Sequence, residues 1–497
     1  MTDLASKPSR NEVRVDGDLA RMTVETEEII GRLNSSGPEL FRLGEALVRV
    51  GGVENPKFEP MNPDRLRRYL AESIYWFTVD EKGKRKPAHP PMPVVRSVLA
   101  ATTWPVPAVD RLTTVPLFAP DGTLVVEAGY FPQGRLFLIP TVRVPPVPVS
   151  PSEEELGRAV NLIVGEVLID FPFVSPSDLA HTVAAMLLPF MRSMIVGPTP
   201  LHLVNAPAKG SGKSLLADVI RSPSDPVGGV MTGAGDKAEW RKRITAFLMD
   251  GRLIILLDNL HGTLDSDALA AVLTETMWSD RILGKSETVD LPNQALWLAT
   301  GNGVTLSDEL LRRTLPILLD AGMEEPHLRA VSEFKHADLK TWVRSSRADL
   351  IWACLTIGQT WVAAGRPPGS VSLGSFESWS ATMGGILEVA GIDGFLGNLA
   401  EWAESGADPV TLGWRGLSQV WWTTHGEQEI TVTEVLGVYD LVGEDFLDLV
   451  GGNDLARSSA LGKALVRKRD AVIGVYKLCS RPKSGSNRYR LMPLPKG

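Results

Sequence analysis

A loop of small residues between an apolar run and a helical pattern has the composition of a phosphate-binding site. The segment LHLVNAPAKGSGKSLLADVI begins at Leu201, and its core, GSGKS from Gly210 to Ser214, matches the second half of the Walker A pattern. Glycines let backbone N–H groups close around phosphate oxygens, and the N-terminus of the next helix adds its dipole. We therefore expect Lys213 to reach the β- and γ-phosphates of a nucleotide and the Ser214 hydroxyl to bind Mg²⁺.

The loop departs from the pattern at its first glycine position, which Pro207 occupies. Proline stiffens the start of the loop and removes one N–H donor. A plain Gly/Ser loop before a helix is the alternative, and the flanking strand and helix patterns disfavour it. The residues expected to contact the nucleotide are Pro207, Ala208, Lys209, Gly210, Ser211, Gly212, Lys213, Ser214 and Leu215.

A second apolar run ends in a carboxylate about 45 residues further on, in GRLIILLDNLHG. Such a run is typical of a buried strand in a parallel sheet, where ligands bind at the carboxyl ends of the strands. Asp258 is then expected to hold Mg²⁺, as a Walker B aspartate does. Asn259 follows where many such enzymes have a glutamate, and an amide cannot act as a general base. Either it orients water only, or a carboxylate elsewhere serves, with Glu239 and Glu275 as candidates.

A third strand pattern, QALWLATGNG, is expected to end at Asn302, beside the Asp258 strand. A polar side chain there could sense the γ-phosphate or position the attacking water. The following SDELLRRTLPILLD places Arg312 and Arg313 near the end of a short helix. Arginines so placed can act in trans on the nucleotide of a neighbouring subunit, although an isolated Arg pair is more often a solvated face.

The C-terminal segment concentrates positive charge in a chain whose formal net charge is -8. Two amphipathic helices followed by two strands joined by PKSGS give the order of a winged helix. Eleven basic residues from Arg457 onward are opposed only by Asp470, which favours phosphate binding over a purely protein-binding role. A helix that carries Lys463, Arg467 and Arg469 could enter a major groove, and the tip of the hairpin at Lys483 could follow the backbone. The expected DNA contacts are Lys463, Arg467, Lys468, Arg469, Lys483 and Arg488.

Composition bounds the remaining possibilities. A chain of 497 residues should form two to four domains. No membrane-spanning run and no signal-peptide pattern is present, and the two distant cysteines suit a reducing cytoplasm better than a metal site. We expect an α/β protein whose parallel-sheet core carries the phosphate loop. The expected parts are an N-terminal mixed α/β domain (1–141), a Pro-rich linker (142–156), the core (157–340), a Trp-rich helical segment (341–428) and the winged helix (429–497).

Local patterns predict several elements within these parts. A short helix capped by Asn62 and small β-hairpins with turns at Asp121-Gly122 and Gly134 are expected in the N-terminal domain. The linker should end at a helix that begins at Ser150 or Ser152. The tryptophans of the helical segment are expected to pack a helical bundle rather than to form a binding cage.

In order and spacing, these motifs resemble the P-loop AAA+ ATPases. More narrowly, TPLHLVNAPAKGSGKSLLAD, LLDNL, WSDRILGKSETV, TGNGVTLSDELLRRT and GGILEVAGIDGFLGN look like superfamily 3 helicases and the related primase–helicases of phages, plasmids and integrated elements. The resemblance covers roughly residues 150–400, and weakly the C-terminal unit. It implies ATP and Mg²⁺ as cofactors and a ring, expected to be a hexamer, in the cytoplasm of a bacterium or phage-infected host.

The resemblance also implies a DNA-tracking hairpin just before the Asn302 strand. Here DRILGKSETVDLPNQA matches, so Lys285 and Arg281 would touch the DNA backbone, unless this is simply an exposed basic loop. Residues 1–140 carry no recognisable polymerase motif, which suggests that priming belongs to a separate partner.

Two functions of different classes remain open at this point. The first is an ATP-driven replicative helicase that moves on single-stranded DNA and acts on forks. The second is an ATP-switched DNA-binding initiator or loader, in which Asn259 leaves hydrolysis slow. A small-molecule P-loop kinase is disfavoured, since it needs neither Asn302 with the arginine pair nor a basic C-terminus.

Overall fold

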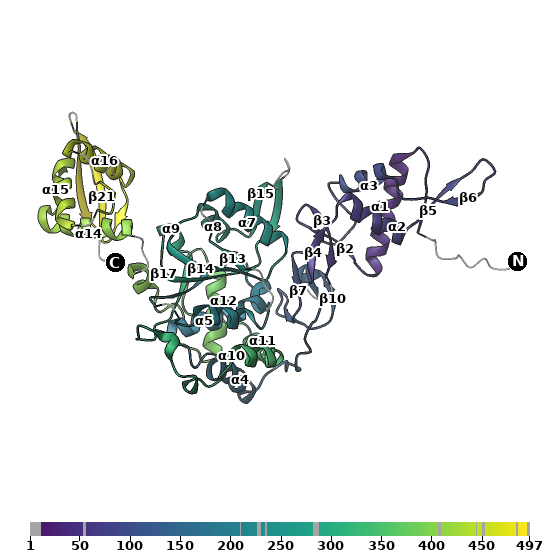
Figure 1. The fold of residues 1–497 in the computed structure, drawn as a ribbon, viewed down its shortest axis with the longest axis horizontal. Helices are drawn as coiled ribbons and strands as arrows, with labels where there is room; N and C mark the ends of the chain where they lie inside the picture. The colour runs from purple at the N-terminus through teal and green to yellow at the C-terminus, as the bar shows by residue number, and fades with distance from the viewer. Residues whose placement is uncertain are drawn as a thin grey trace. The chain divides into compact units, whose positions relative to one another are not determined.

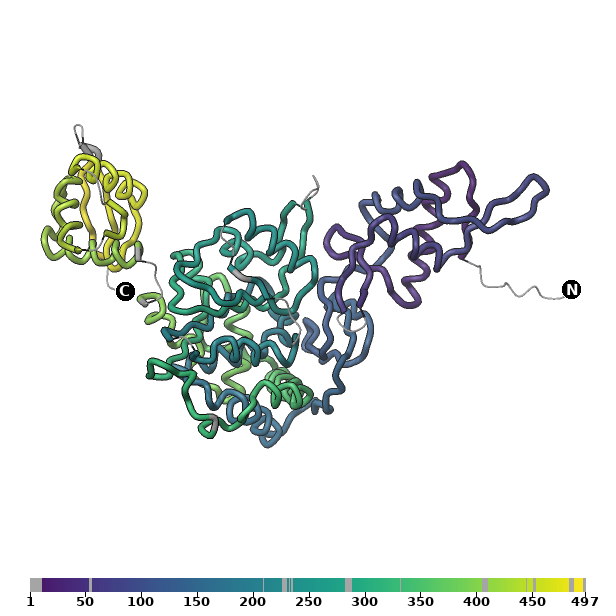
Figure 2. Tube along the Cα trace, in the orientation of Figure 1, coloured from purple at the N-terminus to yellow at the C-terminus, as the bar shows by residue number. Residues whose placement is uncertain are grey.

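The computed structural model describes residues 11–52, 56–208, 210–225, 230–233, 236–281, 288–405, 409–443, 445–449, 453–483 and 486–494. The chain forms two compact units (Figure 1, Figure 2). Unit 1 holds most of the chain up to Leu399, and unit 2 holds Ala400–Gly497 together with the short segments Gly262–Asp265 and Val304–Arg312. Among the described helices, none has the length and apolar composition needed to cross a membrane.

Residues 11–140 form small sheets packed with three helices. The predicted short helix after Asn62 is present, and the Asn62 side chain accepts a hydrogen bond from the Arg65 amide as an N-cap. The two predicted β-hairpins are also present, as β8–β9 and β10–β11. The elements are β1 (Glu12–Arg14), α1 (Leu19–Ser36), β2 (Leu40–Leu43), β3 (Ala46–Gly51), β4 (Lys57–Pro60), α2 (Pro63–Ser73), β5 (Tyr75–Val79), β6 (Arg85–Pro87), α3 (Met92–Leu99), β7 (Arg111–Thr113), β8 (Leu117–Phe118), β9 (Leu124–Val125), β10 (Gly129–Phe131) and β11 (Leu136–Leu138).

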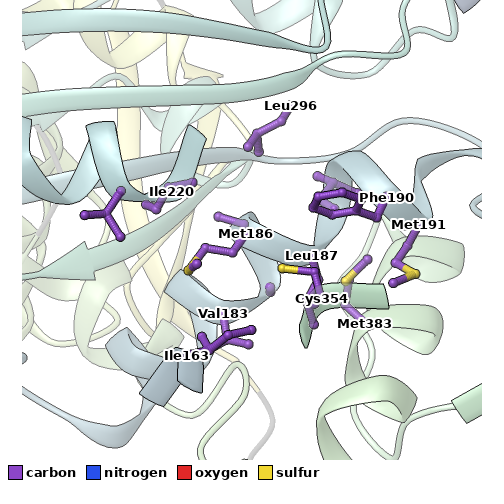
Figure 3. Close-up of a cluster of buried hydrophobic side chains, with 14 of the residues drawn as sticks. Ile163, Val183, Met186, Leu187, Phe190, Met191, Ile220, Leu296, Cys354 and Met383 are labelled. Atoms are coloured by element: carbon purple, nitrogen blue, oxygen red, sulfur yellow. The ribbon is translucent and has the colours of Figure 1, made fainter. Parts of the chain in front are cut away.

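The Pro-rich segment leads into α4 (Glu153–Val160), which starts with a capping box between Ser152 and Glu155, as the sequence predicts. A π-helix (η2, Asn161–Val167) and the buried helix α5 (Pro176–Met191) follow. Figure 3 shows α5 side chains such as Met186 packed among residues of distant elements, including Ile220 and Cys354. These contacts make one large core around α5.

A five-stranded sheet forms the centre of unit 1, in the order β13-β14-β17-β12-β18. The pairs β12–β17, β12–β18 and β13–β14 run parallel, so the predicted α/β class with a parallel sheet is confirmed. In Figure 1, α5 and α12 lie on one side of this sheet and α7 and α8 on the other. The elements are β12 (Leu201–Ala206), α6 (Lys213–Arg221), β13 (Val230–Thr232), α7 (Lys237–Met249), β14 (Ile254–Leu264), α8 (Asp267–Val272), β15 (Met277–Arg281), β16 (Thr288–Pro292), β17 (Leu296–Leu306), α9 (Asp308–Leu311) and β18 (Thr314–Leu318).

Two strand ends differ from the sequence prediction. The pattern ends one strand at Asp258 and the next at Asn302, but β14 and β17 continue to Leu264 and Leu306. Beyond the predicted ends, β17 keeps alternate apolar side chains buried at Val304 and Leu306, and β14 keeps Leu260 and Leu264 buried. Both polar residues therefore lie within strands.

The Trp-rich segment is helical as predicted, and most of its tryptophans are packing residues. Trp361, Trp379 and Trp402 are buried, while His336 stacks on Trp342 with ring centroids 4.1 Å apart. This supports the packing interpretation of the tryptophans. The helices are α10 (Leu339–Ser345), α11 (Arg347–Ala363), α12 (Glu377–Val389), α13 (Leu399–Ser405) and α14 (Pro409–His425).

The C-terminal part contains the two predicted helices and the predicted β-hairpin. α15 (Val432–Val442) begins with a capping box between Thr431 and Glu434, and α16 (Asp454–Arg467) is capped by Asn453. The short strand β19 (Ile430–Thr431) pairs with β22 (Ser486–Pro493), giving the sheet order β19-β22-β21-β20 with β20 (Val472–Ile473) and β21 (Tyr476–Lys483). The chain order after α14 is thus strand, helix, helix and hairpin.

Candidate functional site

The phosphate loop joins the end of β12 to the start of α6. Gly210 and Gly212 have φ values of +81° and +88°, a region that glycine enters without strain. The Lys213 Nζ donates to the Ala208 carbonyl at 3.1 Å, and the Ser211 hydroxyl donates to the same oxygen at 2.7 Å. Burial lowers the pKa of the Lys213 ammonium. The loop therefore closes around the Ala208 carbonyl, and the Lys213 ammonium bound to this carbonyl is partly desolvated. Lys209 lies outside the described residues.

A cavity of about 320 Å³ opens at the carboxyl end of the sheet, beside this loop. Its position follows from the strand register, which pairs Ala206 at the end of β12 with Asn302 of β17. Ligands bind at this edge in open parallel sheets. The lining residues are Gly210, Ser211, Gly212, Lys213, Ser214, Leu215, Asn259, Thr300, Gly301 and Asn302. Six of the nine residues predicted to contact nucleotide thus share one cavity with two of the predicted catalytic asparagines.

A threonine of β17 organises the Asp258–Asn259 pair. The Thr300 hydroxyl donates to the Asp258 carboxylate and accepts from the Asn259 backbone N–H at 2.9 Å. Asn259 has a φ of +59°, a left-handed conformation that asparagine tolerates better than most residues. Its side chain is exposed and lines the cavity. The sequence does not reveal Thr300, because its role depends on β14 and β17 being neighbours.

Asn302 lines the same cavity, and its Oδ1 is buried without a hydrogen-bond partner among the described residues. A buried acceptor left unpaired is costly, so a donor supplied by water or a ligand would stabilise this arrangement. The two carboxylates considered from sequence do not line the cavity. Glu239 instead pairs with Arg243 at 2.9 Å, and Glu275 is exposed in the turn that follows α8. Neither contributes a base to the described site.

Two flanking residues that the sequence did not single out contact the phosphate loop. A Cβ added at Gly210 would lie 3.0 Å from the His327 Cβ, and one at Gly212 would lie 3.6 Å from the Phe171 ring. The segment carrying His327 is held to the end of the π-helix region, since the Lys335 amide donates to the Asp170 carboxylate at 2.7 Å. Close packing against His327 thus adds to the positive φ in requiring glycine at position 210, whereas at Gly212 the neighbouring ring leaves room for a Cβ and only the φ value favours glycine.

The predicted arginine pair lies at the amino ends of the parallel strands, opposite the end where the cavity opens. The Arg313 carbonyl accepts from the Leu201 amide at 2.9 Å, at the start of β12, whereas the phosphate loop follows the end of β12. Six residues of strand separate these points by roughly 17 Å. Arg312 caps the end of α9 and is exposed. Arg313 therefore cannot reach the cavity of its own subunit.

The remaining predicted contacts lie on two hairpins and one helix. β15 and β16 form the antiparallel hairpin expected before the Asn302 strand, and Arg281 is exposed at the end of β15. Lys285 lies outside the described residues. On α16, Leu461 and Leu465 are buried, which leaves Lys463 and Arg467 exposed.

The other predicted DNA contacts of the C-terminal unit are not exposed residues of α16. Arg469 lies beyond the end of α16, contrary to its predicted place on the helix, and pairs with Asp470 at 3.6 Å. The helix ends at Arg467 because the next residue, Lys468, leaves helical geometry. Arg488 lies 3.7 Å from Glu434. The side chain of Lys483 lies outside the described residues.

No protein-family model and no curated protein matches the chain. Among solved structures, an apo structure of the NrS-1 C-terminal region is similar over 94% of this chain and 98% of its own, with 11% identity and a TM-score of 0.39. A second structure of that region gives 12% identity and a TM-score of 0.36, covering 94% and 99%. A SCCmec type IV Cch, described as an active helicase, gives 10% identity and 0.36, covering 90% of each chain. Similarity at this level carries no inference about activity.

Proposed function

We propose that this protein is an ATP-hydrolysing DNA helicase that moves on single-stranded DNA as a ring. The observation that carries the proposal is the cavity that unites the phosphate loop with Asn259, Thr300 and Asn302 at the carboxyl edge of a parallel sheet. A kinase for small molecules could use the same loop. The basic C-terminal unit favours a nucleic-acid partner over a small acceptor.

In this proposal the phosphate loop binds the triphosphate. Gly210 and Gly212 turn backbone N–H groups toward phosphate oxygens, and the start of α6 adds its dipole. The Lys213 ammonium exchanges the Ala208 carbonyl for phosphate oxygens, a stronger acceptor for a desolvated cation. Ser214 and Asp258 supply the oxygen ligands that Mg²⁺ prefers, and the ion would neutralise charge on the β- and γ-phosphates.

Water activation rests on orientation, since none of the described residues that line the cavity is a carboxylate and Asp258 lies next to the lining residue Asn259. Asn302 Oδ1, buried and without a partner among the described residues, accepts a hydrogen bond from the attacking water. The exposed Asn259 amide provides a second contact from the neighbouring strand. Amide side chains position water in other phosphoryl-transfer enzymes without removing its proton.

The ring follows from the arginine pair and from the family resemblance of the sequence. Because Arg313 lies at the amino ends of the strands and the cavity lies at their carboxyl ends, Arg313 can complete a nucleotide site only in another subunit. Arg312, exposed beside it, is the alternative finger. The hexamer is taken from the resemblance, and so is a separate primase as partner.

DNA contact is assigned to two places. Arg281 and Lys285 would follow the strand inside the ring at the β15–β16 hairpin. The C-terminal unit, with the element order of a winged helix, would hold fork or origin DNA through Lys463, Arg467 and Lys468, with Arg488 and Lys483 on its hairpin. The net charge of -8 fits contacts confined to such patches.

One observation favours a second function, an ATP-switched initiator or loader. Neither Asn259 nor Asn302 can remove a proton from water, so hydrolysis could be slow enough for the bound nucleotide to act as an assembly signal. DNA binding and assembly would then require ATP but not its hydrolysis.

Steady-state ATP hydrolysis with and without single-stranded DNA tests the proposal. We expect strong stimulation by DNA, lost in Lys213→Ala, and displacement of a strand from a forked substrate. Lys86→Ala is the matched control, because Lys86 is an exposed lysine paired with Asp80 at 3.3 Å in the N-terminal hairpin. ATP binding without hydrolysis under either condition would contradict the helicase and support the initiator.

A further inference from the structure

The β21–β22 hairpin has one buried and one exposed face. In the antiparallel register, Leu478 is opposite Leu491 and Ser480 is opposite Tyr489, and the three large residues among them are buried in the core of the C-terminal unit. Directly opposite residues share a face, and the face alternates along each strand. The alternate positions therefore face away from this core. They are Lys477, Cys479, Arg481, Arg488, Arg490 and Met492.

Four of these six residues are cationic. We call Lys477, Arg481, Arg488 and Arg490 the outer hairpin face. Arg481 is directly opposite Arg488, and Arg490 is opposite Cys479. No Asp or Glu occurs anywhere in β21 or β22.

Carboxylates from elsewhere neutralise this face only in part. Lys477 lies 3.9 Å from Asp470, and Arg488 lies 3.7 Å from Glu434. Both pairs are long and partly exposed, so each contributes little. Arg481 and Arg490 are exposed and form no ion pair within the described part of the chain. The face thus keeps an excess of positive charge in an acidic protein.

Like charges directly opposite each other on a sheet destabilise it. An arginine facing an arginine is therefore a local cost in the free protein, which a bound polyanion would reverse. The cations span roughly 14 Å along the strands and about 5 Å across them. An elongated patch of this size suits several consecutive backbone phosphates better than a single small anion.

We propose that the outer hairpin face binds the phosphate backbone of DNA, as a surface separate from helix α16. The inference rests on the proposed function for the identity of the polyanion. α16 contributes Leu461 and Leu465 to the same core that the inner hairpin face covers, so its exposed Lys463 and Arg467 and the outer hairpin face lie on different sides of that core. The C-terminal unit can then hold two DNA segments, such as the two arms of a fork.

The contact is independent of sequence. The face consists of cations, with Cys479 and Met492 between them, and it is assigned to backbone phosphates, whose contacts carry no base sequence information. Its contribution should therefore appear as salt dependence rather than as preference for a base.

Binding of the full chain to a labelled forked DNA, without nucleotide and over 50–200 mM salt, tests this. Arg481→Gln with Arg490→Gln should lower affinity at least tenfold at the lowest salt. The magnitude of the negative slope of log affinity against log salt should decrease by about 2, because each of the two lost phosphate contacts removes about 0.9. The thermal midpoint should stay the same or rise, since repulsion is relieved. Lys463→Gln with Arg467→Gln is the matched control on α16 and should leave the contribution of the hairpin intact.

The outcomes separate this inference from the proposed function. Unchanged affinity and slope in the hairpin variant, with loss only in the α16 variant, would overturn the inference while leaving a DNA-stimulated ATPase intact. Conversely, DNA binding that depends on the hairpin, in a protein whose ATP hydrolysis is not stimulated by DNA, would support the outer hairpin face as a DNA-binding surface and contradict the proposed helicase. A wild-type chain that binds no DNA would reject both.

Discussion

Replacing Thr300 by valine isolates the hydroxyl that links Asp258 to Asn259. Valine has nearly the same shape, and Thr300 is only 2% exposed, so packing should be kept. The change removes a bond donated to a carboxylate and leaves the Asn259 amide, which donated at 2.9 Å, without its acceptor. Hydrogen bonds to charged groups contribute about 1.5–3 kcal/mol.

If that energy is used to orient Asp258 in the transition state, kcat for ATP hydrolysis should fall roughly 10- to 150-fold. The KM for ATP should change little, because the phosphate loop itself is untouched. Steady-state kinetics with saturating single-stranded DNA and Mg²⁺ would measure both. Thr300→Ser keeps the hydroxyl and should retain most activity.

Thr263→Val is the matched control in the same strand as Asp258. Its hydroxyl pairs with that of Thr305 at 2.9 Å, outside the residues that line the cavity. It should leave kcat unchanged. Wild-type kcat in Thr300→Val, or an equal loss in Thr263→Val, would refute the assigned role of Thr300.

Gly210→Ala should abolish binding of labelled ADP, because alanine at φ +81°, with its Cβ against a neighbouring side chain, would distort the loop. Gly83→Ala is the control, because Gly83 has a similar φ of +77° but open space around it. It should lower the free energy of unfolding and leave ADP binding unchanged. Arg313→Ala and Lys213→Ala should each be inactive alone and partly active when mixed, whereas no recovery on mixing would count against a trans arginine. His181 is buried with its pKa lowered to about 4 from 6.5, so the unfolded chain binds more protons between these values and stability should fall by about 3 kcal/mol as pH drops from 6.5 to 4. His181→Gln should flatten this dependence in urea unfolding at pH 7.5 and pH 5, and an unchanged slope would show that other groups dominate.

Local signals in the sequence were enough to locate much of the fold. The capped helices after Asn62 and Ser152 and the parallel sheet are present as predicted, because capping residues and apolar runs act over a few residues. The strand ends at Asp258 and Asn302 were predicted wrongly, since both strands continue past these polar residues to Leu264 and Leu306.

The site required information that no local pattern contains. Thr300 gains its partners only because β14 and β17 are adjacent in the sheet. Phe171 and His327 reach the phosphate loop from segments far apart in the chain. The grouping of Arg481 with Arg488 likewise needed the strand register. The roles assigned to these residues stay predictions.

The two cysteines differ in exposure, so only one of them is accessible to a thiol reagent in the folded protein. Cys354 is fully buried, and burial raises the pKa of its thiol to about 12, so it stays protonated and shielded. Cys479 is partly exposed beside the cations of the outer hairpin face. A maleimide reagent should therefore modify the folded protein at one position without any mutation. A dye attached there would report directly on that face, and bound DNA should slow the attachment.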